Sequence, residues 1–150
     1  MKTYEEVRSI LSVIEPEEEM YLQLGPEDLP HLQRMLHEPE PWRAARAIHA
    51  ASRLGSVAAH ALVSGAAGDS RREVRAAVAM ASQWLAPEAG NAVLEKLLDD
   101  ADLSIKKLAI KSVNRNASPG LLAKLKAVSE VAGNDHLKGL AGEQLRAILR

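Results

Sequence analysis

Five histidines are the side chains of this chain best suited to hold a metal ion or to transfer protons. They are His31, His37, His49, His60 and His136. None belongs to an HExxH motif, and no two lie four residues apart beside a third ligand, as a helical zinc site requires. The chain also lacks cysteine, which excludes disulfides and thiolate ligands. The sequence therefore predicts no metal site and no cofactor.

Nucleophilic catalysis has no better support in the sequence. Ser56, Ser82 and Ser112 stand apart from any triad that the sequence could define, and no GxSxG motif surrounds them. No glycine-rich loop is present that could cradle a phosphate. A non-catalytic protein is the resulting prediction.

The charged residues are unevenly distributed along the chain. Residues 1–40 contain three Lys or Arg and ten Asp or Glu, a net charge of −7, whereas residues 41–150 carry a net charge of +6. An acidic end on a basic body can steer a charged partner. The alternative interpretation is a solvated acidic cap at the N-terminal end.

Basic residues recur in the chain with a fixed period. Four pairs, each an apolar residue followed by a basic one, are spaced by 32, 31 and 32 residues. They are Trp42-Arg43, Val74-Arg75, Ile105-Lys106 and Leu137-Lys138. A period of this length indicates stacked units of secondary structure, each of which buries its apolar face against a neighbour.

The periodicity within the units is that of helices, and no segment alternates as a strand does. Thr3 and Glu6 have the spacing of a capping box at the start of a helix that continues through Ile14 and ends at Pro16. A short turn is expected within residues 17–25. Helix pairs follow at 26–38 and 43–54, 57–67 and 70–85, 87–98 and 103–113, and from 119 onward and 137–149. We expect one structural domain: a capping helix with an acidic connector over 1–24, then a repeat array over 25–150.

The composition suits thin stacked layers of helices. Apolar residues make up 47% of the chain but aromatic residues only 3%, so packing must come from small and aliphatic side chains. The N-terminal residues are too charged for a signal peptide, and no apolar run approaches the length that spans a membrane. We therefore expect a cytoplasmic protein with no membrane partner.

One decapeptide and its partial repetition resemble a known family. Residues 69–78 read DSRREVRAAV, and residues 100–109 repeat the pattern of an Asp, a short gap, an aliphatic–basic pair and an Ala. This pattern resembles the HEAT repeats, in particular the short HEAT-like repeats of bilin lyases, over residues 25–150. The first and fourth copies are weaker. The resemblance implies an all-α, right-handed solenoid of about four helix pairs, with an N-terminal capping helix and a structural ladder of Asp69, Arg75, Asp100 and Lys106 between repeats.

The resemblance also raises alternative functions. A HEAT-like hydroxylase family binds iron through His-Glu dipeptides on successive repeats, but only His37-Glu38 has that form here. A lyase-related activity is a further possibility, although this chain is short and has no aromatic-rich pocket signature. HEAT-like DNA glycosylases bind DNA along a basic surface, so nucleic acid is an alternative partner. The isoelectric point of about 6.5 and the scarcity of aromatic residues argue against it.

The function that we expect is protein–protein binding through the second helix of each repeat, as in an adaptor, inhibitor or assembly factor. The expected partner-binding residues are Arg46, Arg53, Trp84, Lys111 and Arg115. The expected partner is a protein, and a basic face of this kind would suit an acidic one. Trp84 aligns with Arg53 of the preceding repeat, which predicts a partly exposed ring, whereas Trp42 occupies a core-type position and is expected to be buried. The last helix could self-associate, so a monomer or a weak homodimer is expected.

Overall fold

The computed structural model describes residues 1–131 and 133–150, and this part of the chain is helical without any strand. The prediction of an all-α fold is therefore confirmed. The α-helices are α1 (Tyr4–Leu11), α2 (Glu18–Leu22), α3 (Leu29–Leu36), α4 (Pro41–Ser52), α5 (Val57–Gly65), α6 (Arg72–Ala81), α7 (Pro87–Leu98), α8 (Leu103–Ser112), α9 (Pro119–Val131) and α10 (Asp135–Leu149). Three 3-10 turns accompany them: η1 (Pro26–Asp28), η2 (Ala66–Gly68) and η3 (Ser82–Trp84).

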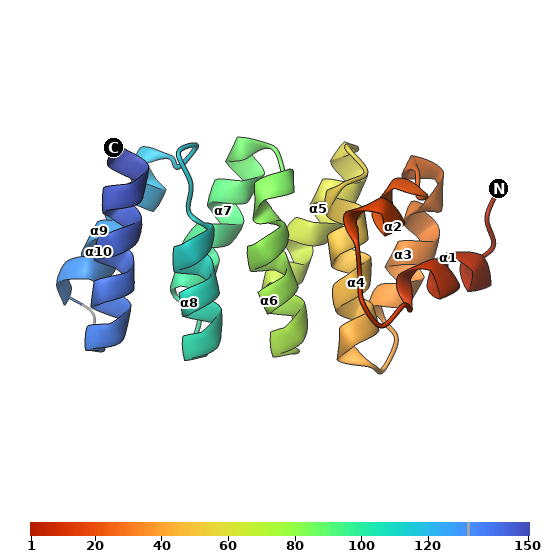
Figure 1. Ribbon diagram of the computed structural model, residues 1–150, viewed down its shortest axis with the longest axis horizontal. Coiled ribbons are helices and arrows are strands. Elements are labelled where there is room, and N and C mark those ends of the chain that lie inside the picture. The colour runs from red at the N-terminus through yellow and green to blue at the C-terminus, as the bar shows by residue number, and fades with distance from the viewer. Residues whose placement is uncertain (132) are drawn as a thin grey trace.

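Helices α3 to α10 alternate between two layers that extend in one row. In Figure 1, α4, α6, α8 and α10 stand side by side in the front layer, with α3, α5, α7 and α9 behind them. Neighbours within the front layer contact one another, and α4, α8 and α10 each pack on the helix that precedes them. The two termini lie at opposite ends of the row. The front layer therefore presents four consecutive helices on one face of the molecule.

Helix starts are set by local chemistry. The side chain of Thr3 accepts a hydrogen bond from the Glu6 backbone N–H at 3.1 Å, and that of Asn134 accepts one from Leu137 at 3.1 Å. Such caps satisfy N–H groups that have no partner within the helix. Proline occupies the first residue of α4, α7 and α9, where its missing N–H costs nothing. The starts of α1, α7 and α9 agree with the sequence prediction, whereas α4 and α10 each begin two residues earlier than predicted, at Pro41 and Asp135.

Helix α1 is shorter than the sequence predicts. It ends at Leu11 instead of continuing through Ile14, whose side chain is 94% exposed. The physical reason lies in α4: Arg46 donates hydrogen bonds to the carbonyl oxygens of Leu11 and Val13 at 2.9 and 2.7 Å. Those carbonyls thereby find partners without further helix. These hydrogen bonds join residues that are separated by 35 and 33 positions in the sequence, so local periodicity gives no sign of them.

Trp42 is also placed differently from the prediction. Val74, Ile105 and Leu137, which mark the same place in the later units, are buried, but Trp42 is 42% exposed. The guanidinium carbon atoms of Arg43 and Arg46 lie 4.7 and 5.5 Å from the centroid of its ring. Two cations stacked on the indole stabilise a surface position that an aliphatic side chain would not favour. Trp84 is 44% exposed, as expected.

The core consists mainly of small and aliphatic side chains. Alanines dominate the contact between α4 and α6, where Ala44, Ala47, Ala51, Ala77 and Ala81 are all buried. Short side chains allow helices to approach closely, and dense packing of this kind leaves little tolerance for added volume.

Helix α1 is held at one end of the row by a polar cluster. Glu38, in the turn between α3 and α4, accepts hydrogen bonds from the Tyr4 hydroxyl and from Arg8 Nε, the latter at 2.6 Å. Burial, together with the hydrogen bond to Glu38, raises the pKa of Tyr4. Val7 and Leu11 bury the apolar side of the helix. Helix α1 is thus anchored independently of the residues that follow it.

Two glycines test how tightly the layers pack. A Cβ atom on Gly90, which is buried in α7, would lie 2.9 Å from the backbone oxygen of Ser82. We expect Gly90→Ala to lower the free energy of unfolding by about 1–3 kcal/mol. Gly139 in α10 has no atom within 4 Å of such a Cβ, so Gly139→Ala should raise it by about 0.5–1 kcal/mol. Urea unfolding measures the free energy of unfolding of both variants. A higher value for Gly90→Ala than for the unchanged protein would contradict the close approach of α7 to η3.

Candidate functional site

Arg75 joins two turns of neighbouring helix pairs. Its Nε donates to Asp100 Oδ2 at 2.8 Å and its Nη2 to Asp100 Oδ1 at 3.2 Å, while Nη1 donates to the backbone oxygens of Asp69 and Ser70. Burial alone would raise the pKa of Asp100, but the hydrogen bonds from Arg75 and from the Asp102 N–H outweigh it and lower that pKa. The guanidinium group therefore ties the turn before α6 to the turn before α8.

Arg71 connects the turn before α6 with the preceding helix pair. It forms two hydrogen bonds with the carboxylate of Asp69, both at 3.0 Å, and donates to the carbonyl oxygens of Leu36 and Glu38 at 2.8 and 3.1 Å. The side-chain hydrogen bond from Arg71 lowers the pKa of Asp69. The Asp69 side chain thus pairs with Arg71, and Arg75 reaches only its backbone. The sequence reasoning missed Arg71, whose one signal is its place two residues after a turn aspartate.

Lys106, the fourth residue expected in the ladder, is half-buried and forms no ion pair among the described residues. Lys124 of α9 provides the next connection, because its Nζ donates to the Asp99 carboxylate and, at 3.0 Å, to the carbonyl oxygen of Glu95. The structure therefore brings Asp69, Arg75 and Asp100 together, and it does not bring Lys106 to them.

A pair of arginines in α6 tests the connection. Arg75→Gln leaves the half-buried Asp100 carboxylate without its cation, so we expect a loss of about 1–3 kcal/mol in the free energy of unfolding. Arg72 is the matched control, since its side chain is 60% exposed and lies 3.8 Å from Asp102. Arg72→Gln should change stability by less than about 0.5 kcal/mol. Equal effects in denaturant unfolding would show that Arg75 contributes no more than a surface ion pair.

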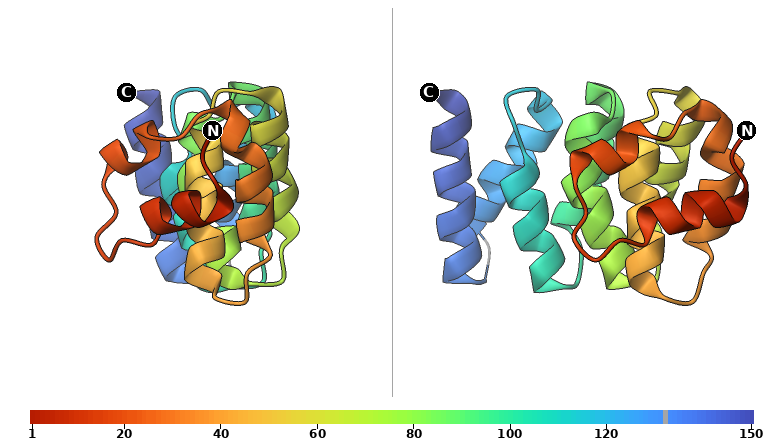
Figure 2. Two further views of the ribbon diagram at one scale, coloured as in Figure 1. Left: turned by 90° about the vertical axis from the view of Figure 1, so that its right-hand side faces the viewer. Right: turned by 45° about the vertical axis from the view of Figure 1, so that its right-hand side comes forward.

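The N-terminal strap, defined here as residues 12–24, crosses the front of α4 (Figures 1 and 2). Arg46 donates to the backbone oxygens at the beginning of the strap, including that of Ile14 at 3.4 Å. Met20, Tyr21 and Leu24 are buried, and Ile14 and Leu22 are largely exposed. The strap thus covers part of the face that the sequence analysis assigns to partner binding.

Arg53 is the centre of the contact between the strap and the front face. Its Nε and Nη2 donate to the two carboxylate oxygens of Glu18 at 2.8 and 2.5 Å. Its guanidinium carbon lies 4.4 Å from the centroid of the Tyr21 ring and 4.6 Å from that of Trp84. The hydrogen bond from Arg53 lowers the pKa of Glu18. Planar stacking between two aromatic rings together with a bidentate carboxylate contact is a geometry that arginine satisfies and lysine does not.

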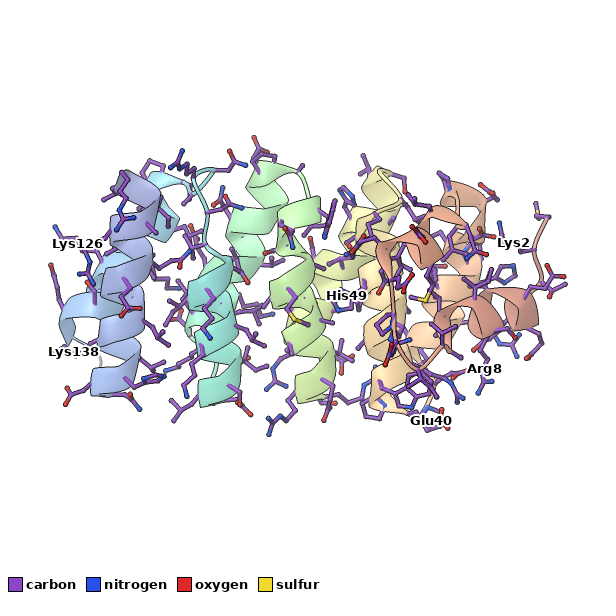
Figure 3. The ribbon with its side chains drawn as sticks, in the orientation of Figure 1. Lys2, Arg8, Glu40, His49, Lys126 and Lys138 are labelled. Carbon is purple, nitrogen blue, oxygen red and sulfur yellow. The ribbon has the colours of Figure 1, made fainter. Side chains whose placement is uncertain are left out.

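His49 lies on α4 at the level of the strap (Figure 3). Burial lowers its pKa to about 4, with further contributions from the positive charges of Arg53 and Arg46. The imidazole is therefore neutral near pH 7 in the folded protein. Two other histidine rings contact backbone oxygens, namely His31 with Lys2 and His60 with Ser52.

The low pKa of His49 predicts that stability falls as the pH is lowered from 6.5. Below pH 6.5 this histidine becomes protonated in the unfolded chain, where its pKa is the ordinary 6.5, but stays neutral in the folded chain. Protonation therefore stabilises the unfolded state. The contribution amounts to about 2 kcal/mol between pH 6.5 and 5, a window above the pKa values of carboxylates. Urea unfolding from pH 7 to 5 measures the slope.

His49→Gln should remove most of that slope. The exposed His136 is the matched control, because water surrounds its ring in both states, and His136→Gln should leave the slope unchanged. A slope that persists in the His49 variant would place its origin elsewhere in the protein.

A groove of about 590 Å³ lies between α6, α8 and α10. Met80, Leu108 and Ile148 provide apolar surface, and Lys111 and Arg115 contribute positive charge. None of the described residues that line the groove is acidic, and neither cation forms an ion pair within the described ranges. Gln144 holds α10 beside α8 by donating to Val113 O at 2.6 Å. The groove combines apolar contact area with two exposed cations.

The five residues expected to bind a partner thus fall into two groups. Arg46 and Arg53 are engaged with the strap, whereas Lys111 and Arg115 share the groove. Trp84 lies between them, since its ring stacks on Arg53 and the preceding residue, Gln83, lines the groove. The sequence predicts all five on the second-helix face, but contacts between residues more than thirty positions apart, through which the strap engages Arg46 and Arg53, have no signature in it.

Within residues 1–131 and 133–150, no group of three or more His, Cys, Asp or Glu side chains is arranged to hold a metal ion. None of the helices there has the length and apolar character needed to cross a membrane.

Comparison with protein-family models and with curated proteins finds no match for the chain.

Proposed function

We propose that this chain is a non-catalytic protein-binding module of the HEAT-repeat type, built as a right-handed solenoid of four helix pairs, α3–α4 to α9–α10. The spacing of 31–32 residues between the apolar–basic pairs supports this assignment. The contacts of Arg71 and Arg75 between successive turns support it as well, because a stacked array needs an interaction that repeats between neighbours.

The groove between α6, α8 and α10 is the observation that carries the proposed function. It offers Lys111 and Arg115 with no carboxylate among the described residues that line it, above an apolar surface of Met80, Leu108 and Ile148. Cations at the rim attract an acidic partner and hold it in register, while apolar contacts contribute most of the binding free energy. A partner segment that presents both carboxylates and apolar side chains satisfies both parts of the groove.

The proposed partner is therefore an acidic segment of another protein, bound by the second-helix face in the cytoplasm. Trp84 lies where the groove meets the strap and is placed to anchor the partner, since tryptophan often contributes strongly to binding. The protein itself acts as a monomer or a weak homodimer. In this proposal the binding face, and not a catalytic centre, is the functional part of the molecule.

Affinity capture from native extract, with Lys111 and Arg115 both changed to Glu, tests the proposal. We expect capture of the specific partner to fall by at least about tenfold and to weaken with salt in the unchanged protein. Lys126→Glu with Lys138→Glu is the charge-matched control, at the α9–α10 end of the molecule (Figure 3), and should retain capture.

Two results would contradict the proposal. Equal loss in both double variants would indicate a general effect of net charge and no role for the groove. Capture that disappears on nuclease treatment, with a steep dependence on salt, would identify nucleic acid as the ligand instead.

A further inference from the structure

The N-terminal strap makes the kind of contacts that a bound ligand makes. Its carboxylate at Glu18 pairs with Arg53, its ring at Tyr21 stacks on the same guanidinium group, and its backbone oxygens accept hydrogen bonds from Arg46. Of these partners on the folded body, Arg46 lies on α4 and Arg53 directly follows its last residue. Trp84 of η3 closes the opposite side of Arg53. The face of α4 is therefore equipped to bind an acidic segment, and the chain supplies one itself.

The charges of the two surfaces are complementary. The strap carries Glu15, Glu17, Glu18 and Glu19 within five residues, whereas the covered face presents Arg46 and Arg53 with a neutral His49. Only Glu18 of those four forms an ion pair among the described residues. Attraction between the strap and α4 thus has an electrostatic part beside the burial of apolar side chains, and this part is sensitive to salt and to competition by another acidic segment.

The strap is held less firmly than the helices it crosses. Helix α2 has only five residues, too few to be stable without docking, and the apolar side chains of Ile14 and Leu22 are 94% and 81% exposed. A pocket of about 500 Å³ remains between the strap and the front layer, lined by Tyr21, Trp42, His49 and Arg53 among others. Because α1 has its own anchors in Val7, Leu11 and Glu38, the strap can leave α4 while α1 stays in place.

We propose that the α4 face beneath the strap is a second docking site, which takes a short acidic helix from a protein partner in place of the strap. The occupant carries a carboxylate for Arg53 and an aromatic ring three residues later, the spacing of Glu18 and Tyr21. The inference rests on the proposed function, because it concerns the same second-helix face and an acidic partner. The strap acts as an internal competitor. The apparent affinity of the site for a partner is its intrinsic affinity multiplied by the fraction of molecules in which the strap is undocked.

A peptide with the sequence of residues 13–24, added in trans, is the probe that tests this proposal. Glu18→Gln in the protein weakens the internal strap, so the peptide should bind this variant about three- to tenfold more tightly than the unchanged protein. Glu19→Gln is the matched control, since Glu19 is exposed on the same helix and forms no ion pair in the described part of the chain. It should bind the peptide as the unchanged protein does. Calorimetric titration at low salt measures the affinities.

Two further variants locate the site. Arg53→Gln, introduced into the Glu18→Gln protein, should remove the gain in affinity, and a peptide that carries Glu18→Gln should bind several-fold more weakly than its parent. Amide hydrogen exchange at residues 19–24 should accelerate in the Glu18→Gln protein, remain unchanged in the Glu19→Gln protein, and leave α1 protected. Both single variants must retain the helical circular dichroism of the unchanged protein.

The outcomes separate this inference from the proposed function. No binding of the peptide to the Glu18→Gln protein at millimolar concentration overturns the inference, as does equal affinity for the Glu18 and Glu19 variants. Loss of partner capture on changing Lys111 and Arg115 would still support the groove in that case. Peptide binding that depends on Arg53, together with capture that ignores Lys111 and Arg115, would support the α4 site and contradict the groove.

Discussion

The spacing between neighbouring helix pairs depends on arginine side chains that reach from one turn to the next. Arg71 links the turn before α6 to the backbone after α3, and Arg75 links it to Asp100 in the turn before α8. Apolar packing has no preferred direction and by itself would permit small shifts of one helix along another. Directional hydrogen bonds from a planar guanidinium group do not permit such shifts. These contacts fix the turns before α4, α6 and α8 relative to one another, while Lys124 and Gln144 hold the last pair.

Local chemistry explains which parts of the fold could be predicted from the sequence. Helix starts at Thr3 and Asn134, and prolines at the first residue of α4, α7 and α9, depend on neighbours within a few positions, so the predicted elements are found. The end of α1 and the exposure of Trp42 depend on Arg46, which acts over more than thirty positions in the first case. Periodicity contains no information about such a contact.

The candidate site shows the same division between local and distant causes. The period places Arg46, Arg53, Trp84 and Lys111 on second helices and Arg115 just beyond one; in the structure Arg53 stacks on Trp84, and Lys111 and Arg115 line one groove. Whether a given cation is available depends on the acidic N-terminal residues, which approach α4 and leave α8 uncovered. The charge imbalance between residues 1–40 and 41–150 is visible in the sequence. The fold shows which charges meet, because Glu18 of the acidic end pairs with Arg53 of the basic face.

The two tryptophans have a consequence for spectroscopy. They are the only indoles in the chain, and each has an arginine cation over its ring: Arg43 and Arg46 over Trp42, and Arg53 over Trp84. Two of these three arginines, Arg46 and Arg53, also hold the strap. Indole emission responds to nearby charge and to water, so release of the strap from Arg46 and Arg53 would change the ultraviolet fluorescence of the protein. The molecule thus contains an optical probe of its own surface and needs no attached dye.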